Sequence, residues 1–275
     1  MKSLLVATDL SDRSARALDR AFAIAERAGA RLKLLHVTDA DLPEEMATAQ
    51  QHAAMQRLTG LAAARPEVDA HVEAAIDDPM TKIHTAADEA GAELIVLGVH
   101  RSRPLADMFS STTMERLVRA SAQPVLLVKD AVSGPYAHPL CGVDLSPACA
   151  AAARMAADLA PGAPIAAYYA FHAPFRGFRD SEAQMAPFQA EAKASLEEWM
   201  KGADLPETFQ PPAPVAAGVR HALEMAMHRM AEAGGKTDLL VIGAHGRSVF
   251  SPNLLGSFTE ELLRHPLCDT LVAKG

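Results

Sequence analysis

The stretch Val241-Ile-Gly-Ala-His-Gly-Arg-Ser-Val-Phe-Ser-Pro-Asn-Leu-Leu-Gly-Ser257 decides the fold, because it joins an apolar run to the start of a helix. Residues 239–242 are Leu-Leu-Val-Ile, and this run predicts a buried strand. Ser257 is followed three residues later by Glu260, a spacing typical of a capping box at a helix N-terminus. The stretch therefore predicts a strand, a glycine-rich loop and a helix in succession.

Three glycines within this loop lie at fixed offsets. Two residues separate Gly243 from Gly246, and nine separate Gly246 from Gly256. Glycine lets the backbone turn and approach a ligand where a Cβ would prevent it. The free N–H groups at a helix N-terminus, together with the helix dipole, favour an anion such as phosphate. The loop is therefore a candidate phosphate site.

Working outward, the first half of the chain alternates short apolar runs with longer amphipathic segments. Near-continuous apolar strands alternating with helices predict a parallel sheet covered on both faces, joined by right-handed crossovers. The predicted strands are residues 4–7, 32–37, 68–76, 94–97 and 125–128, and the predicted helices lie between residues 11 and 29, 43 and 64, 79 and 91, and 112 and 120.

The second half repeats the first. Three segments of one half have counterparts in the other, in the same order: Leu5-Val-Ala-Thr-Asp-Leu-Ser11 and Leu140-Cys-Gly-Val-Asp-Leu-Ser146, Ile95-Val-Leu-Gly98 and Leu240-Val-Ile-Gly243, and Leu126-Leu-Val-Lys129 and Leu271-Val-Ala-Lys274. Two tandem copies of one domain explain this order better than chance likeness among apolar strands. We expect domains at residues 1–132 and 138–275, with a linker around residues 132–136.

The glycine spacing resembles the nucleotide loop of the universal stress protein family, whose ATP-binding members carry Gly-x2-Gly-x9-Gly-(Ser/Thr). Gly243, Gly246, Gly256 and Ser257 match every fixed position. The resemblance covers the whole chain as a tandem member. It implies an α/β fold of two tandem doubly wound five-stranded parallel sheets, each in the order 3-2-1-4-5, in the Rossmann-like manner of this family.

The resemblance also implies further binding residues in the second copy, because ligands of open α/β sheets lie at the carboxyl ends of strands where the strand order reverses. Val143 would offer backbone contacts to adenine, and its side chain is otherwise a core residue. Asp144 either lies near the base and ribose or a metal, or caps the next helix together with Ser146. Arg247 and Ser248 lie on the loop, where they either contact phosphate or face solvent and satisfy the turn.

The first copy departs from this pattern. Gly98 remains and Thr112 keeps the hydroxyl position, but Arg101 and Ser111 replace the second and third glycines. A side chain at position 101 blocks the approach of phosphate, so we expect no ATP binding of this kind in the first copy. The alternative is that Arg101 and Arg103 recruit a different anion.

Composition limits the remaining possibilities. The chain has 275 residues, 49% of them apolar, and a formal net charge of −8. The acidic balance argues against nonspecific nucleic-acid binding, and no apolar run is long enough for a membrane span. Because Asp9 follows soon after Met1, we expect no signal peptide. The three cysteines, Cys141, Cys149 and Cys268, lack metal-ligand spacing, so we expect reduced thiols, a cytoplasmic protein and no metal-binding cluster.

The leading functional hypothesis is a stress protein that binds ATP, with or without Mg²⁺, in its second domain. It would act in signalling or stress adaptation, with at most slow ATP hydrolysis, since no catalytic acid–base or nucleophile–base pair is recognisable. The family resemblance implies pairing of the final strands of the two copies in an intramolecular pseudo-dimer, with a homodimer as a further step. One alternative is an interaction module without nucleotide function. The other is an adenylating enzyme. The loop at residues 144–147 argues against this alternative, because it contains no glycine.

Overall fold

The computed structural model describes residues 1–12, 14–99, 111–173, 182–244 and 255–274. Contacts divide the chain into two compact units. The first comprises Met1–Pro135 with Leu262–Thr270, and the second comprises Tyr136–Glu261 with Leu271–Gly275. The contact-defined first unit therefore takes in a short segment that lies near the end of the chain.

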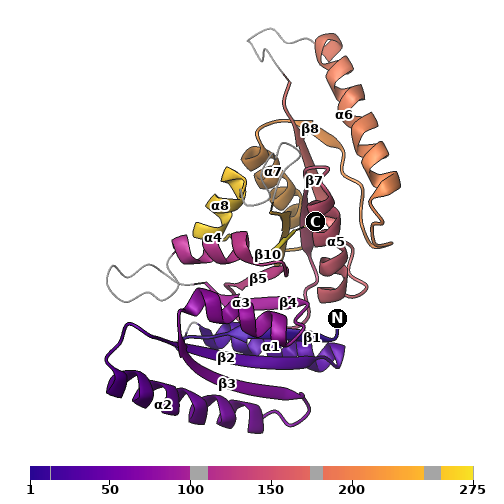
Figure 1. Ribbon diagram of the computed structural model, residues 1–275. Coiled ribbons are helices and arrows are strands. Elements are labelled where there is room, and N and C mark those ends of the chain that lie inside the picture. The colour runs from indigo at the N-terminus through magenta and orange to yellow at the C-terminus, as the bar shows by residue number, and fades with distance from the viewer. Residues whose placement is uncertain (13, 100–110, 174–181, 245–254, 275) are drawn as a thin grey trace. The chain divides into compact units, whose positions relative to one another are not determined.

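The first unit contains a sheet of parallel strands in the order β3-β2-β1-β4-β5. This is the order that the family resemblance implied, and Figure 1 shows the strands with their connecting helices. Its elements are β1 (Ser3–Ala7), α1 (Ser14–Ala28), β2 (Arg31–Asp39), α2 (Glu44–Ala63), β3 (Ala70–Asp77), α3 (Pro79–Glu89), β4 (Leu94–Gly98), α4 (Ser111–Ala120) and β5 (Val125–Val128).

The second unit repeats the arrangement, with its strands in the order β8-β7-β6-β9-β10. The two tandem α/β sheets predicted from the sequence are thus confirmed. The elements of this half are β6 (Pro139–Val143), α5 (Pro147–Leu159), β7 (Ala166–Phe171), α6 (Glu182–Gly202), β8 (Pro214–Ala216), α7 (Val219–Glu232), β9 (Leu239–Gly243), α8 (Ser257–Arg264) and β10 (Asp269–Ala273).

Helices cover both faces of each sheet, as right-handed crossovers require. In the first unit α1 and α2 share one face: Arg65, just after α2, bonds the carboxylate of Asp19 on α1 at 2.7 Å and lies over the Phe22 ring at 4.4 Å. α3 and α4 contact each other on the opposite face. In the second unit Arg154 on α5 donates to the carbonyl of Ala203, which follows α6. The carboxyl ends of the central strands therefore remain for the connecting loops.

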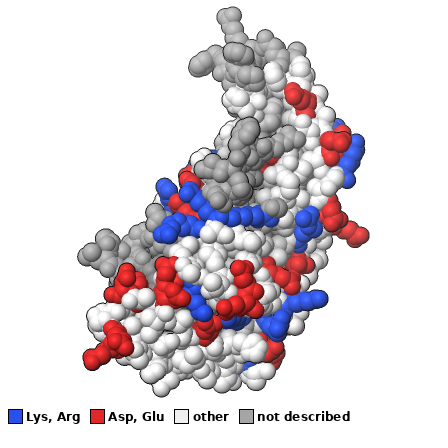
Figure 2. All heavy atoms as spheres, viewed as in Figure 1, with Lys and Arg blue, Asp and Glu red and all other residues white. Residues whose placement is uncertain are grey.

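Charges are interspersed over the surface. On the face that Figure 2 shows, acidic and basic side chains alternate over the described atoms instead of gathering by sign. None of the helices in the described ranges is long and apolar enough to cross a membrane.

One buried pair of residues differs between the two sheets. In the second unit Gly142 on β6 lies beside Tyr168 on β7, and a Cβ built on Gly142 would lie only 2.7 Å from the tyrosine Oη. Tyr168 is 2% exposed, so its ring has no open space to move into. The register places Ala7 and Leu35 at the same positions of the first sheet. The second sheet therefore has a glycine beside a tyrosine where the first has an alanine beside a leucine.

We predict that Gly142→Ala destabilises the protein by about 1–3 kcal/mol, because the added methyl overpacks a closed site. Adding Tyr168→Leu recreates the pair of the first sheet and removes the clash. In urea unfolding the double variant should be more stable than the sum of the two single losses predicts, by about 1 kcal/mol or more. Strict additivity would contradict this packing account.

Candidate functional site

The candidate site lies where β6 and β9 end side by side. Cys141 pairs with Val241 in the register of these parallel strands, so Val143 and Gly243 end the two strands at the same edge of the sheet. Val143 is 6% exposed, which places its side chain in the core and leaves its backbone for any ligand contact. The structure thus brings together two residues that the sequence predicted for one site.

A strained turn follows β6. Asp144 accepts a hydrogen bond from the Ser146 backbone N–H at 2.9 Å, and Leu145 between them has a φ of 63°. A leucine in the left-handed region is uncommon, and such strain tends to persist at functional sites. The first unit repeats the turn, with Leu10 at a φ of 60° and Ser11 donating to Asp9. Each copy therefore carries the same strained turn at the same edge of its sheet.

Ser146, which follows this turn, is the N-cap of α5. Its Oγ accepts from the Cys149 backbone N–H at 3.1 Å, and its carbonyl accepts from the Trp199 indole at 3.2 Å. Asp144 thus shapes the turn before the helix, while the cap itself is Ser146. The half-buried Asp144 carboxylate lies at the same strand edge as Gly243.

Gly243 has a packing reason to be glycine. A Cβ at this position would lie 3.0 Å from the Cys149 backbone nitrogen and 3.2 Å from the Ala148 Cβ, at the start of α5. The Gly243 carbonyl faces the Thr259 hydroxyl at 3.5 Å. The close approach of a strand to a helix terminus thus explains this glycine without a ligand.

Gly256 has no such reason within the part of the chain that the structure describes. A Cβ there would meet only the Thr259 Oγ1, at an ordinary 3.9 Å, among the described atoms, and its φ is not positive. The Gly256 N–H donates to the Ala244 carbonyl, which joins the two ends of the loop. Packing among the described residues therefore leaves this glycine unexplained.

Helix α8 begins at Ser257, and its first turn closes with the Glu260 N–H donating to the Gly256 carbonyl. Ser257 is thus the first helical residue and not the residue before the helix that the capping-box spacing predicted. Helix boundaries vary by a residue or two with the criterion. The amino end of α8 nevertheless lies at the loop that the sequence assigned to phosphate.

The remaining predicted site residues, Gly246, Arg247 and Ser248, lie outside the described residues. Arg101 and Arg103, the candidates for an anion in the first copy, also lie outside them. Their roles stay predictions from the sequence.

The corresponding edge of the first unit holds a different set of polar contacts. His36, at 9% exposure, donates from Nδ1 to the Thr8 carbonyl at 2.9 Å in the tautomer that this contact requires. The Thr8 hydroxyl lies 2.8 Å from that of Ser14 and accepts from the Leu10 N–H. Tyr169 takes the place of His36 in the second sheet, next to Val143. His36 falls within the second predicted strand, residues 32–37, and the sequence did not predict this contact.

Burial lowers the pKa of His36 from its ordinary 6.5, although the Thr8 carbonyl and the Asp9 carboxylate both raise it. As the pH falls, His36 is therefore protonated near pH 6.5 in the unfolded chain, and only at a lower pH in the folded protein. Stability is therefore fully present above this pH and falls as the pH decreases toward the folded pKa, by at most about 1.4 kcal/mol per pH unit. The free energy of unfolding should therefore decrease from pH 7.5 to pH 5.5, and we predict that this decrease is smaller in His36→Gln. The same loss in both proteins, measured by urea unfolding, would rule out this contribution.

All three cysteines lie in the described part of the chain, where they are buried and form no disulfide. The Sγ atoms of Cys141 and Cys149 lie 4.0 Å apart. Contact with the Cys149 thiol, and then burial, raises the pKa of Cys141 well above its ordinary value and keeps it protonated. Within the described ranges, no cluster of three or more His, Cys, Asp or Glu side chains could hold a metal ion.

Comparisons with known proteins match this geometry. A sequence model described as "Universal stress protein family" matches residues 1–129 and again 135–274. A universal stress protein from Archaeoglobus fulgidus is 15% identical, with 99% of this chain and 98% of that one covered and a TM-score of 0.69. A candidate universal stress protein from Pseudomonas aeruginosa is 20% identical, with 100% and 93% covered and a TM-score of 0.65. The curated proteins contain no match. At these identities the structural likeness establishes the fold.

Proposed function

Because the chain belongs to the universal stress protein family, we propose that its second copy binds ATP and that the protein acts in signalling or stress adaptation. The first copy would serve as scaffold and partner surface, because it lacks two of the three loop glycines. The occurrence of two copies in one chain fits the expected intramolecular pseudo-dimer. Association into a homodimer stays a prediction.

The observation that carries the proposal is Gly256. Gly243 is explained by the approach of α5, but nothing in the described structure requires a glycine at position 256. A ligand lying against the amino end of α8 would supply the reason, since phosphate oxygens reach backbone N–H groups where no Cβ intervenes. The spacing of the loop glycines and the adjacent turn at Asp144 point to the same ligand.

Mg²⁺ fits this edge through Asp144. Protein-bound Mg²⁺ commonly takes one or two carboxylates together with substrate phosphates and water. The Asp144 carboxylate is half-buried at the strand end, and one of its oxygens fixes the turn. When bound, the ion would neutralise phosphate charge. Hydrolysis would at most be slow, because the described edge presents no evident catalytic base.

The proposal is tested on freshly purified protein. We expect denaturation to release an adenine nucleotide, detected by absorbance and mass spectrometry, and ATP with Mg²⁺ to raise the melting temperature of the emptied protein. No released nucleotide together with no thermal shift would favour the pure interaction module. Conversion of a carboxylate substrate to an adenylate would favour the adenylating enzyme.

A substitution at Gly256 separates ligand binding from folding. We predict that Gly256→Ala changes the free energy of unfolding by less than about 1 kcal/mol, because the methyl meets only an ordinary contact. Affinity for ATP, measured by calorimetry, should fall at least tenfold. Gly243→Ala is the matched comparison, since it should destabilise the fold itself. Unchanged ATP affinity in Gly256→Ala would remove the main support for the proposal.

A further inference from the structure

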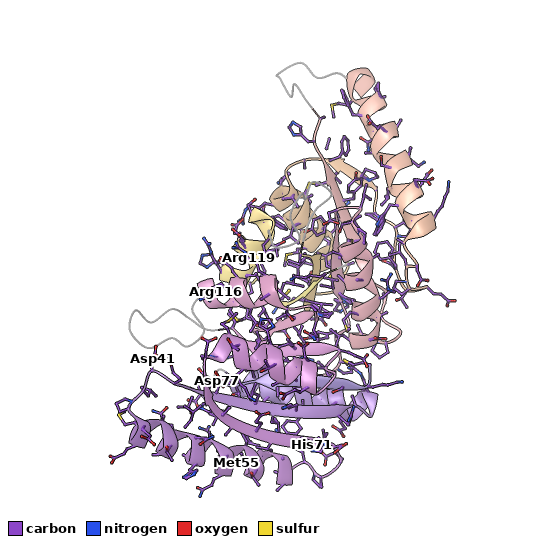
Figure 3. The ribbon with its side chains drawn as sticks, in the orientation of Figure 1. Asp41, Met55, His71, Asp77, Arg116 and Arg119 are labelled. Atoms are coloured by element: carbon purple, nitrogen blue, oxygen red, sulfur yellow. The ribbon has the colours of Figure 1, made fainter. Side chains whose placement is uncertain are left out.

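Each unit contains a hollow at the amino end of its sheet, far from the edge where the candidate nucleotide site lies. The hollows have volumes of about 370 Å³ in the first unit and about 390 Å³ in the second. Both lie against the start of the first strand, the second strand and the helix after the third strand. Figure 3 shows His71, which lines the first hollow, and Asp77 at opposite ends of β3.

The two hollows occupy equivalent positions. Leu5 pairs with Lys33 in the first sheet and Leu140 pairs with Ala166 in the second, so Ala166 takes the place of Lys33. The helices on that side, α3 and α7, follow their N-caps at Asp78 and Gly218. Counting from these caps, Arg229 of α7 takes the place of Glu89 of α3. The strand register likewise places Ala213 at the position of Glu73.

Ion pairs cross the first hollow. The Lys33 Nζ lies 2.6 Å from one Glu73 oxygen, and the Lys82 Nζ lies 2.5 Å from the other. Burial raises the pKa of Glu73, but hydrogen bonds from the two lysines outweigh it and hold the pKa below its ordinary value. Glu89 lies 3.9 Å from Lys33 and adds a second carboxylate. The lysine and glutamate side chains at the first hollow therefore already pair with one another.

The second hollow does not have the charges that Lys33 and Glu73 give to the first. Alanines stand at the positions of Lys33 and Glu73, and the described residues that line this hollow include no carboxylate. Its one formal cation among the lining residues is Arg229, an exposed arginine for which the described residues provide no ion pair. The result is a mainly apolar hollow with a single guanidinium at its rim.

We propose that this second hollow binds a small amphipathic carboxylate, with its apolar body against Ala166, Ala213 and Met230 and its carboxylate on Arg229. The volume lies in the range of small-molecule pockets. A guanidinium binds a carboxylate through two parallel hydrogen bonds, and burial of the hydrocarbon part supplies the remaining affinity. This ligand is independent of ATP, because the hollow and the glycine loop lie at opposite ends of the strands.

Octanoate is the probe for the test, with octanol and octylammonium as charge controls. In calorimetry and amide-resolved NMR of the full chain, octanoate should bind and perturb the amides of Ala166 and Ala213, while the two controls should bind at least tenfold more weakly. Arg229→Glu, which installs the residue of the first unit at an exposed site, should weaken octanoate binding at least tenfold.

The first unit also indicates which substitutions would fill the second hollow. Ala166→Lys with Ala213→Glu recreates the Lys33–Glu73 pair and should abolish octanoate binding, with urea unfolding as the check on the fold. If this double variant fails to fold, Arg229→Glu and Arg229→Met carry the test alone. No octanoate binding at millimolar concentration, or equal affinity in the wild type and both Arg229 variants, would overturn the proposal. ATP binding is measured separately, so failure of one proposal leaves the other standing.

Discussion

An arginine in place of Gly246 is expected to abolish ATP binding while leaving the protein folded. Gly246→Arg gives the second domain an arginine at the position that Arg101 occupies in the first domain. The side chain would occupy the space through which phosphate reaches the loop N–H groups. We expect affinity to fall at least 100-fold, about 2.7 kcal/mol, as measured by calorimetry with ATP and Mg²⁺.

The matched variant is Arg101→Ala in the first domain. It should leave ATP affinity within about twofold of the wild type, because the proposed site lies in the other copy. Urea unfolding of both variants separates lost binding from lost folding. Equal losses of affinity in Gly246→Arg and Arg101→Ala would show that a single working site in the second domain is the wrong assignment.

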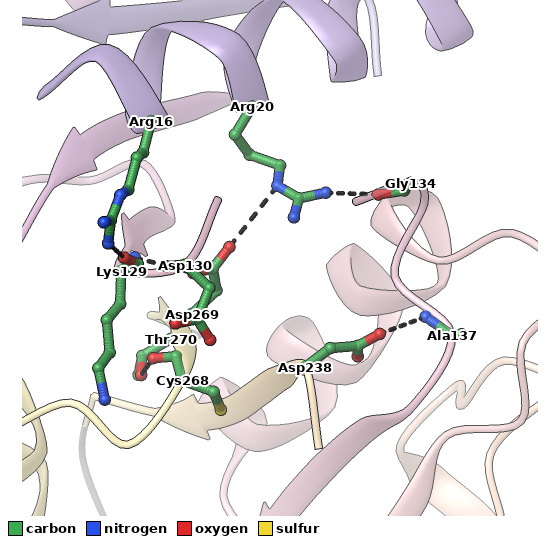
Figure 4. Close-up of polar contacts among 10 residues, drawn as sticks. All are labelled: Arg16, Arg20, Lys129, Asp130, Gly134, Ala137, Asp238, Cys268, Asp269 and Thr270. Atoms are coloured by element: carbon green, nitrogen blue, oxygen red, sulfur yellow. Dashed lines mark hydrogen bonds and ion pairs between the residues drawn. The ribbon is translucent and has the colours of Figure 1, made fainter. Parts of the chain in front are cut away.

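Removing the carboxylate of Asp269 is expected to be among the most destabilising single changes in the chain. Asp269 is fully buried within the contact-defined first unit, where its Oδ1 accepts from the backbone N–H groups of Lys129 and Asp130 at 2.8 and 2.9 Å. Its Oδ2 lies 3.6 Å from the Nε of Arg20, which is 5% exposed and also donates to the Gly134 carbonyl (Figure 4). One carboxylate thus satisfies two backbone donors and a buried cation.

Asp269→Ala leaves Arg20 without this anion and two backbone N–H groups without an acceptor. Breaking a buried pair in this way costs about 3–5 kcal/mol. Urea unfolding followed by circular dichroism should show a loss of that size. Asp130→Ala is the control, because it keeps the backbone N–H that Asp269 bonds and should cost less than about 1 kcal/mol. Similar losses in the two variants would contradict this assignment.

The architecture could be predicted because it depends on patterns spread over many residues. Apolar strands alternating with amphipathic helices indicated a parallel sheet, and the Asp-Leu-Ser segments after the first strand of each half indicated two copies. The strand order of both sheets, which the family resemblance implied, is confirmed by the structure. Errors in single boundaries, such as the start of α8 at Ser257, do not affect that order.

Features that depend on one close approach could not be predicted. Leucine propensity gives no sign of the left-handed turns at Leu10 and Leu145, which the Asp side chains before them stabilise. In the sequence, Gly243 and Gly256 both match fixed positions of the loop motif and cannot be told apart. Among the described residues, packing requires a glycine at Gly243 but not at Gly256. Such distinctions require the positions of neighbouring elements, because the added Cβ meets atoms far away in the chain.

The most direct test is a crystal structure of the full chain grown with ATP and Mg²⁺. We expect density for one nucleotide per chain, with its phosphates against the 243–257 loop of the second domain and its base beside the Val143 backbone. Density only in the first domain, or a second-domain loop folded into the space that the phosphates need, would contradict it.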